Sequence, residues 1–147
     1  MLPNIGYYVQ SVDRMVKETE EIGEQMHPKY QVIREAIDQK KTEDLSPEEL
    51  AEIVHLFEEG TKKYRVILKK ISQLRPPAKV MGIHKSFEKA YTSYVAGCEE
   101  MTQSIQPESG VDHDLFDASE EKQDQATENI SSAIQKMTNL LLKNKTV

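Results

Sequence analysis

The sequence contains no tryptophan, a single cysteine, and only six glycines and six prolines among its 147 residues. Because Cys98 has no second cysteine to pair with, no disulfide can form within the chain, a usage typical of reducing compartments. The first residues lack the basic segment and apolar run of a signal peptide, and no stretch approaches the roughly 18 apolar residues of a membrane span. We therefore expect a soluble, cytoplasmic protein, although export without a leader would leave no such mark.

An overall excess of basic residues is also absent. The formal net charge is −6, which argues against a general nucleic-acid binder because affinity for phosphate needs clustered lysine and arginine. No glycine-rich phosphate loop occurs, and no serine or threonine has an evident partner base. Glu99 and Glu100 follow Cys98, and nearby acids and burial both disfavour a nucleophilic thiol because they raise its pKa. The sequence thus predicts neither an enzyme nor a cofactor.

What the sequence does contain is four stretches with apolar residues at every third or fourth position. This spacing is typical of helices that pack in a bundle. The 37% hydrophobic and 30% charged residues suit helices with one apolar stripe and a wide polar face. We predict an all-α fold, an antiparallel up-down-up-down four-helix bundle that forms a single domain over residues 1–147. The expected helices span about residues 4–40, 46–75, 78–105 and 117–143.

Three local signals support the first half of this plan. Pro28 lies within the first helix and removes one backbone donor, so it should kink that helix or split it. Ser46-Pro47-Glu48-Glu49 is a capping box with proline at the first helical position, which marks the start of the second helix. Pro76-Pro77 ends that helix. The second and third helices should then be antiparallel neighbours.

The second half is marked less clearly. Residues 107–114 are rich in Gly, Ser and Asp and indicate a loop. Asp117, with Glu120 three residues later, indicates a second capping box and the start of the fourth helix. The stripe of that helix is weak at Lys122 and Ala126. A homodimer could cover whatever part of the core this weak stripe leaves open.

Two Glu-x-x-His pairs, Glu24 with His27 and Glu52 with His55, resemble the ligand pairs of di-metal helical bundles. At about 100° per residue, however, Glu24, Glu52 and His55 face away from the apolar stripes, and His27 lies at the flank of its stripe. These residues are therefore interpreted as solvated surface, and no metal site is predicted.

One histidine does lie within an apolar stripe, and several tyrosines share its surroundings. Buried tyrosines need polar partners, so a polar cluster is expected here. Such a cluster could line a ligand pocket, or it could be an ordinary packed core with a hydrogen-bonded histidine. The ligand-pocket candidates are His84, Tyr91, Tyr94 and Tyr64.

The charges predict an electrically polar bundle, basic at one end and acidic at the other. Acids at helix starts and bases at helix ends complement the helix dipole in the second and fourth helices. The third helix instead has bases near its start and acids near its end, an arrangement that the helix dipole does not explain. Either an acidic partner, or head-to-tail self-association, or simple matching of neighbours sets it. The partner-surface candidates are Lys69, Lys70, Arg75, Lys79, Lys85 and Lys89.

A short segment resembles small uncharacterised helical proteins of Gram-positive bacteria, in which a Pro-Pro turn leads into a helix with His, aromatic and Tyr residues. The matching positions are Leu74-Arg75-Pro76-Pro77, His84, Phe87, Tyr91, Tyr94 and Gly97. The resemblance covers about 25 residues, implies a bacterial helical bundle, and transfers no active site.

Together these observations favour a non-enzymatic protein–protein interaction or adaptor bundle with an unidentified protein partner, and the basic end of the bundle would suit an acidic one. The alternative is a small-molecule-binding bundle with a pocket near His84, Tyr91 and Tyr94. A pocket lined by those side chains would favour the alternative, whereas a packed core with an apolar surface patch would favour the interaction module.

Overall fold

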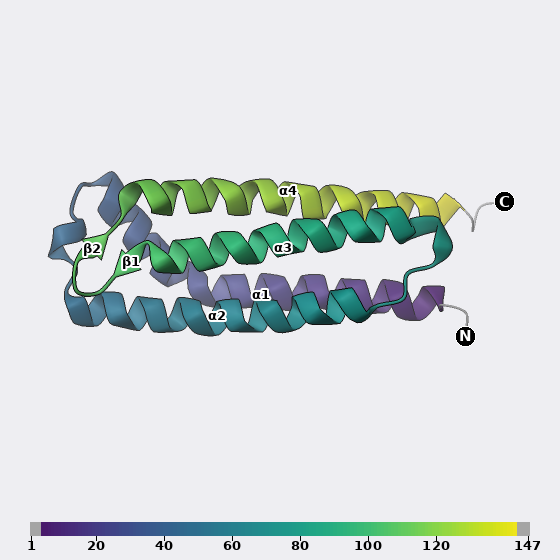
Figure 1. The fold of residues 1–147 in the computed structure, drawn as a ribbon, viewed down its shortest axis with the longest axis horizontal. Helices are drawn as coiled ribbons and strands as arrows, with labels where there is room; N and C mark the ends of the chain where they lie inside the picture. Colours follow the sequence, from purple (N-terminus) through teal and green to yellow (C-terminus); the bar gives the residue numbers. More distant parts are fainter. Residues whose placement is uncertain (1–3, 144–147) are drawn as a thin grey trace.

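The computed structural model describes residues 4–143, with side chains as far as residue 141. Four long helices lie side by side, and Figure 1 shows each running opposite to the helix before it. Both ends of the described chain lie at one end of the bundle, which we call the terminal end (Figure 1). The prediction of an all-α four-helix bundle is confirmed. The long helices are α1 (Ile5–Asp38), α2 (Pro47–Gln73), α3 (Met81–Gln103) and α4 (His113–Lys143).

Helix α1 passes through Pro28 without a break. The helix is therefore not split, and Figure 1 shows its last turns inclined toward the start of α4. Proline removes only one backbone hydrogen bond, and packing on both sides of it maintains the helix. Asn4 caps the start by accepting from the amide of Tyr7 at 3.0 Å. The helix ends at Asp38, earlier than expected, because Lys40 adopts a left-handed conformation with φ of 57°.

The capping box at the start of α2 is confirmed. The amide of Glu49 donates to Ser46 Oγ at 3.1 Å, and the Glu49 carboxylate accepts from the Ser46 amide at 3.5 Å. A short 3-10 helix, η1 (Thr42–Asp44), precedes it. At the other end Leu74 is extended, so α2 stops just before Pro76-Pro77, as the prolines require.

The third predicted helix is shorter than expected and is followed by a structure that the sequence analysis missed. A 3-10 helix, η2 (Ala78–Val80), precedes α3. Two short antiparallel strands, β1 (Ile105–Gln106) and β2 (Gly110–Val111), form a hairpin. The loop predicted over 107–114 is therefore confirmed in part, at residues 107–109, which form the turn between the strands. Gly110 has a φ of +107°, which a residue with a side chain rarely adopts.

The predicted start of α4 at Asp117 is wrong. The helix begins at His113, and the Asp112 carboxylate accepts from the amide of Leu115 at 3.1 Å. Asp117 instead accepts a hydrogen bond from Arg34 of α1 at 2.8 Å. The Asp117 and Glu120 pattern that predicted a helix cap therefore reflects tertiary ion pairs, because both acids bind Arg34 of α1.

Two apolar clusters form the core, one in each half of the bundle. The weak stripe in the first half of α4 reflects small side chains, since Ser119 and Ala126 are buried against α3. Lys122, which the sequence analysis placed on the stripe, is exposed and pairs with Glu100 at 3.0 Å. Gln123 lies toward α3 instead and donates to the carbonyl of Gly97 at 3.2 Å.

Candidate functional site

His84 of α3 is buried at the terminal end, where it forms hydrogen bonds with α1 and α2. Its Nδ1 lies 2.7 Å from the Tyr8 hydroxyl of α1, and its Nε2 lies 3.1 Å from the carbonyl oxygen of Ile71 in α2. The Tyr8 hydroxyl also lies 3.4 Å from Met137 Sδ in α4. A neutral His84 that donates from Nε2 to Ile71 and accepts from Tyr8 at Nδ1 satisfies every polar atom. His84 is thus a packed and fully bonded core residue.

The three tyrosines lie one after another toward the middle of the bundle. The Tyr91 hydroxyl lies 2.7 Å from Thr19 Oγ1 of α1, and Thr19 in turn donates to the Met15 carbonyl. Tyr94 donates to the Tyr64 hydroxyl at 3.3 Å, and their ring centroids lie 5.1 Å apart, edge to face. The predicted polar cluster therefore forms three separate hydrogen-bonded groups, around His84, Tyr91 and Tyr64.

Burial disfavours ionisation of the tyrosines and of Cys98. Burial raises the pKa of Tyr8 and of Tyr94 to about 12, and it raises those of Tyr64 and Tyr91 as well. Burial also raises the pKa of the Cys98 thiol to about 12, so the reactive thiolate is disfavoured at neutral pH. The buried hydroxyls and the thiol remain neutral and act in packing.

The six partner-surface candidates at the terminal end have no acidic partners within the described residues. Within residues 4–141, none of the partner-surface candidates forms an ion pair. All six are exposed: Lys69, Lys70, Arg75, Lys79, Lys85 and Lys89. The acids at the far end of α3 differ, because Glu99 pairs with Arg65 at 3.0 Å and Glu100 pairs with Lys122. Ion pairs with neighbouring helices therefore explain why acids lie at the end of α3, but no such pairs explain the lysines at its start.

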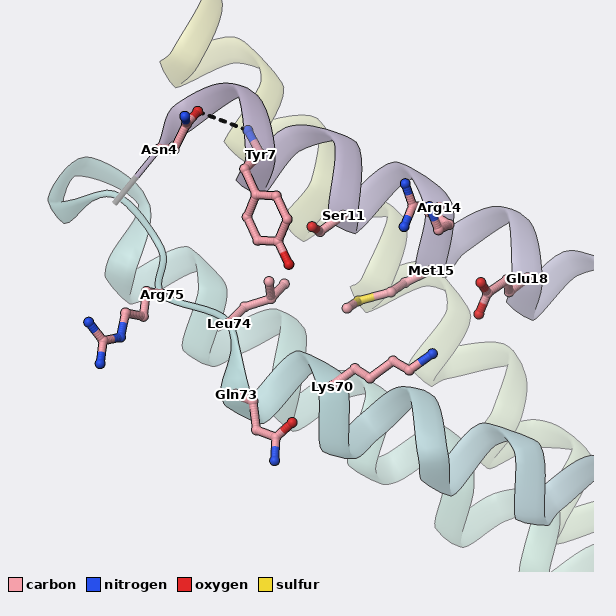
Figure 2. A pocket seen from close by; sticks show the side chains of 10 residues that line it. All are labelled: Asn4, Tyr7, Ser11, Arg14, Met15, Glu18, Lys70, Gln73, Leu74 and Arg75. Atoms are coloured by element: carbon pink, nitrogen blue, oxygen red, sulfur yellow. Dashed lines mark hydrogen bonds between the residues drawn. The ribbon is translucent and has the colours of Figure 1, made fainter. Parts of the chain in front are cut away.

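A groove of about 590 Å³ lies between the start of α1 and the end of α2. We call it the basic groove. Its charged lining residues are Arg14, Lys70, Arg75 and a single acid, Glu18. Figure 2 shows Tyr7, Met15 and Lys70 reaching into the space between the two helices, with Arg75 at one end and pointing outward. The sequence analysis named Lys70 and Arg75 but missed the α1 wall, because no local pattern shows which part of α2 lies opposite α1.

The other predicted lysines do not all face this groove. Lys89 lines a separate groove between α3 and α4 together with Lys136. The six candidate residues thus surround the terminal end rather than form one patch, and two of them, Lys70 and Arg75, lie in the basic groove.

An apolar groove of about 230 Å³ follows the contact between α1 and α4 at the same end. Ile5 and Val9 lie along it with 45% of each side chain exposed. The homodimer suggested from the sequence stays a prediction, since this surface identifies no partner by itself.

The structure gives no support for a metal centre in the part of the chain it describes. No group of three or more His, Cys, Asp or Glu residues within residues 4–141 could hold a metal ion together. His27 stacks on Tyr30 with ring centroids 5.7 Å apart, and Glu52 lies 3.9 Å from Lys29. No helix among the described residues has the length and apolar character needed to cross a bilayer.

Comparison of the chain with family models, with curated proteins and with solved structures gives no match. The resemblance to helical proteins of Gram-positive bacteria therefore stays a prediction, and the functional argument rests on the geometry of this chain.

Proposed function

We propose that this protein is a non-enzymatic binding module that recruits an acidic protein partner through the basic groove at its terminal end. The observation that carries the proposal is the pairing of an open groove with cations that lack intramolecular acids. Arg14, Lys70 and Arg75 line the groove against the single carboxylate of Glu18. Since the whole chain has a net charge of −6, this local excess of positive charge stands against the overall composition.

The groove also offers apolar surface between its charges. Leu74 and Met15 lie on its lining, and Tyr7 is 66% exposed beside them. Aromatic side chains and arginine are enriched where proteins bind one another, because they combine large contact area with hydrogen-bonding groups. An acidic segment with interspersed apolar residues would match both features of the groove.

The proposal has a direct test in solution. Fluorescence anisotropy would follow a fluorescein-labelled amphipathic helical peptide with leucine at every third or fourth position and glutamate on the opposite face, compared with the same peptide in which lysine replaces glutamate. We expect the acidic peptide to bind and the basic peptide not to bind. Between about 50 and about 500 mM NaCl the affinity should fall steeply, because the Debye length shrinks over that range.

Charge-reversal variants separate the basic groove from the general basic character of this end. Arg14→Glu and Lys70→Glu should each raise the dissociation constant of the acidic peptide by about tenfold, since each replaces an attractive contact by a repulsive one. Lys89→Glu is the matched control, because it makes the same change in net charge at the same end but in the other groove. An equal loss in all three variants, or binding that ignores salt, would refute the assignment.

Two further features belong to this proposal. The lone, buried Cys98 forms no disulfide, which supports a reducing, cytoplasmic location. The raised pKa values of the buried tyrosines and of Cys98 support the absence of a catalytic role.

A further inference from the structure

A further cavity lies in the middle of the bundle, where His27 and Tyr30 of α1 line it. It has a volume of about 260 Å³, and we call it the inner cavity. Its buried lining residues come from α2 and α3 and include Phe57, Thr61 and Cys98. Its exposed lining residues, His27 and Asp124, come from α1 and α4. The cavity therefore opens between α1 and α4, where the end of α1 inclines toward α4 (Figure 1).

The lining of the inner cavity is largely aromatic, and its carboxylates are those of Glu120 and Asp124. Four aromatic rings line it, those of Tyr30, Phe57, Tyr64 and Tyr94. Tyr64 and Tyr94 bond to each other through their hydroxyls, so neither phenol needs a partner from a ligand. The electron-rich faces of such rings attract organic cations when water is excluded.

The mouth of the cavity has a surplus of negative charge. Glu120 and Asp124 lie there. Glu120 accepts from Arg34 at 2.8 Å, but the same guanidinium also binds Asp38 and Asp117, so one positive charge is shared among three carboxylates. Asp124 forms no ion pair with another side chain in the described part of the structure. Burial and the neighbouring Asp124 raise the pKa of Glu120, as expected where acids outnumber bases.

We propose that the inner cavity binds a small organic ammonium ion, with its alkyl or aromatic substituents among the rings and its charge near Glu120 and Asp124. A neutral apolar compound would use the same walls but gain nothing from the acidic mouth. An anion would be repelled there. The chemistry of the site thus selects an alkylated amine, and this inference does not depend on the basic groove.

The experiment compares two probes of the same shape. Benzyltrimethylammonium carries the charge, and neopentylbenzene is its neutral carbon analogue. Binding would be followed by NMR of the methionine methyl groups, because Met26 and Met101 line the cavity whereas Met81 is exposed on α3 and serves as an internal reference. We expect the ammonium probe to bind about tenfold more tightly than the neutral one.

Three variants test whether the probe binds in the cavity. Gly23→Leu should abolish binding, because Gly23 lines the cavity and a leucine side chain there would fill it. The added Cβ itself would meet only the Tyr64 hydroxyl, at an ordinary 3.5 Å. Gly82→Leu is the matched control, since it also removes a helical glycine but has no neighbour within 4 Å of an added Cβ. Asp124→Asn should weaken the binding of the ammonium probe by about threefold and leave the binding of the neutral probe unchanged.

Each outcome decides the question. Selective shifts at Met26 and Met101 that disappear in Gly23→Leu and persist in Gly82→Leu support the site. Equal binding of the two probes would show an apolar cavity without cation selectivity, and it would overturn the proposal. Unchanged binding in Gly23→Leu would overturn it as well, because the probe would then lie elsewhere.

Discussion

Replacing Tyr8 by phenylalanine removes one hydroxyl group from the contact between α1, α3 and α4. Tyr8 is only 1% exposed, and its hydroxyl lies 2.7 Å from Nδ1 of His84, which is itself 5% exposed. Tyr8→Phe keeps the ring and its packing but leaves the acceptor nitrogen of His84 buried without a donor. An unsatisfied buried polar group costs about 1–3 kcal/mol. A domain of this size has a total stability of about 5–15 kcal/mol, so the loss is a measurable fraction.

Urea unfolding followed by far-UV circular dichroism measures this loss. With a slope of about 2 kcal/mol per molar urea, a change of about 2 kcal/mol lowers the midpoint by about 1 M. Tyr7→Phe is the matched control, because Tyr7 is the next residue, is 66% exposed, and should change stability by less than about 0.5 kcal/mol.

A double-mutant cycle with His84→Leu then isolates the contact itself. Because the two side chains touch, the double variant should lose less stability than the sum of the single variants, by about 0.5–3 kcal/mol. The reasoning fails if Tyr8→Phe behaves like Tyr7→Phe, or if the two single losses simply add.

Two further predictions concern packing and pH. Gly97→Ala should destabilise the protein by about 1–3 kcal/mol, because an added Cβ would lie 2.8 Å from Gln123 Cγ and 3.3 Å from backbone atoms of α4. Gly82→Ala, measured by the same urea assay, should instead stabilise by up to about 1 kcal/mol, since its added Cβ meets nothing within 4 Å. The folded pKa values of Tyr94 and Cys98, about 12, exceed the ordinary values of 10.0 and 9.0. Their contribution is complete below about pH 9, so urea midpoints should fall as the pH rises toward 12, and unchanged midpoints between pH 9 and 11 would contradict it.

The sequence predicted the helices best where the signal is local. The capping box at Ser46 and the prolines at 76 and 77 act through their own backbone, so the ends of α2 follow directly from them. The start of α4 was wrong because both Asp112 and Asp117 can cap a helix, and the choice depends on Arg34, distant in sequence. The short β-hairpin was missed because two residues per strand leave no alternating pattern.

The candidate site was predicted only in part for a similar reason. Periodicity placed His84 and the tyrosines inside the bundle, where they are. It could not show that Tyr64 and Tyr94 line a cavity while His84 and Tyr91 are packed, since the cavity is formed by residues of all four helices. The same limit hid Arg14, which reaches the predicted basic end from the first helix.

The hydrogen-bonded line through His84 has a consequence for the choice among competing packings. It contains one group from each of three long helices: Tyr8 of α1, Ile71 of α2 and His84 of α3. The apolar stripes repeat every three or four residues, so a helix displaced axially by one turn would still meet apolar neighbours. The polar line does not repeat, and such a displacement would leave the buried imidazole and phenol unpaired. One histidine thereby favours a single axial register of α1, α2 and α3, which their apolar stripes alone would leave degenerate.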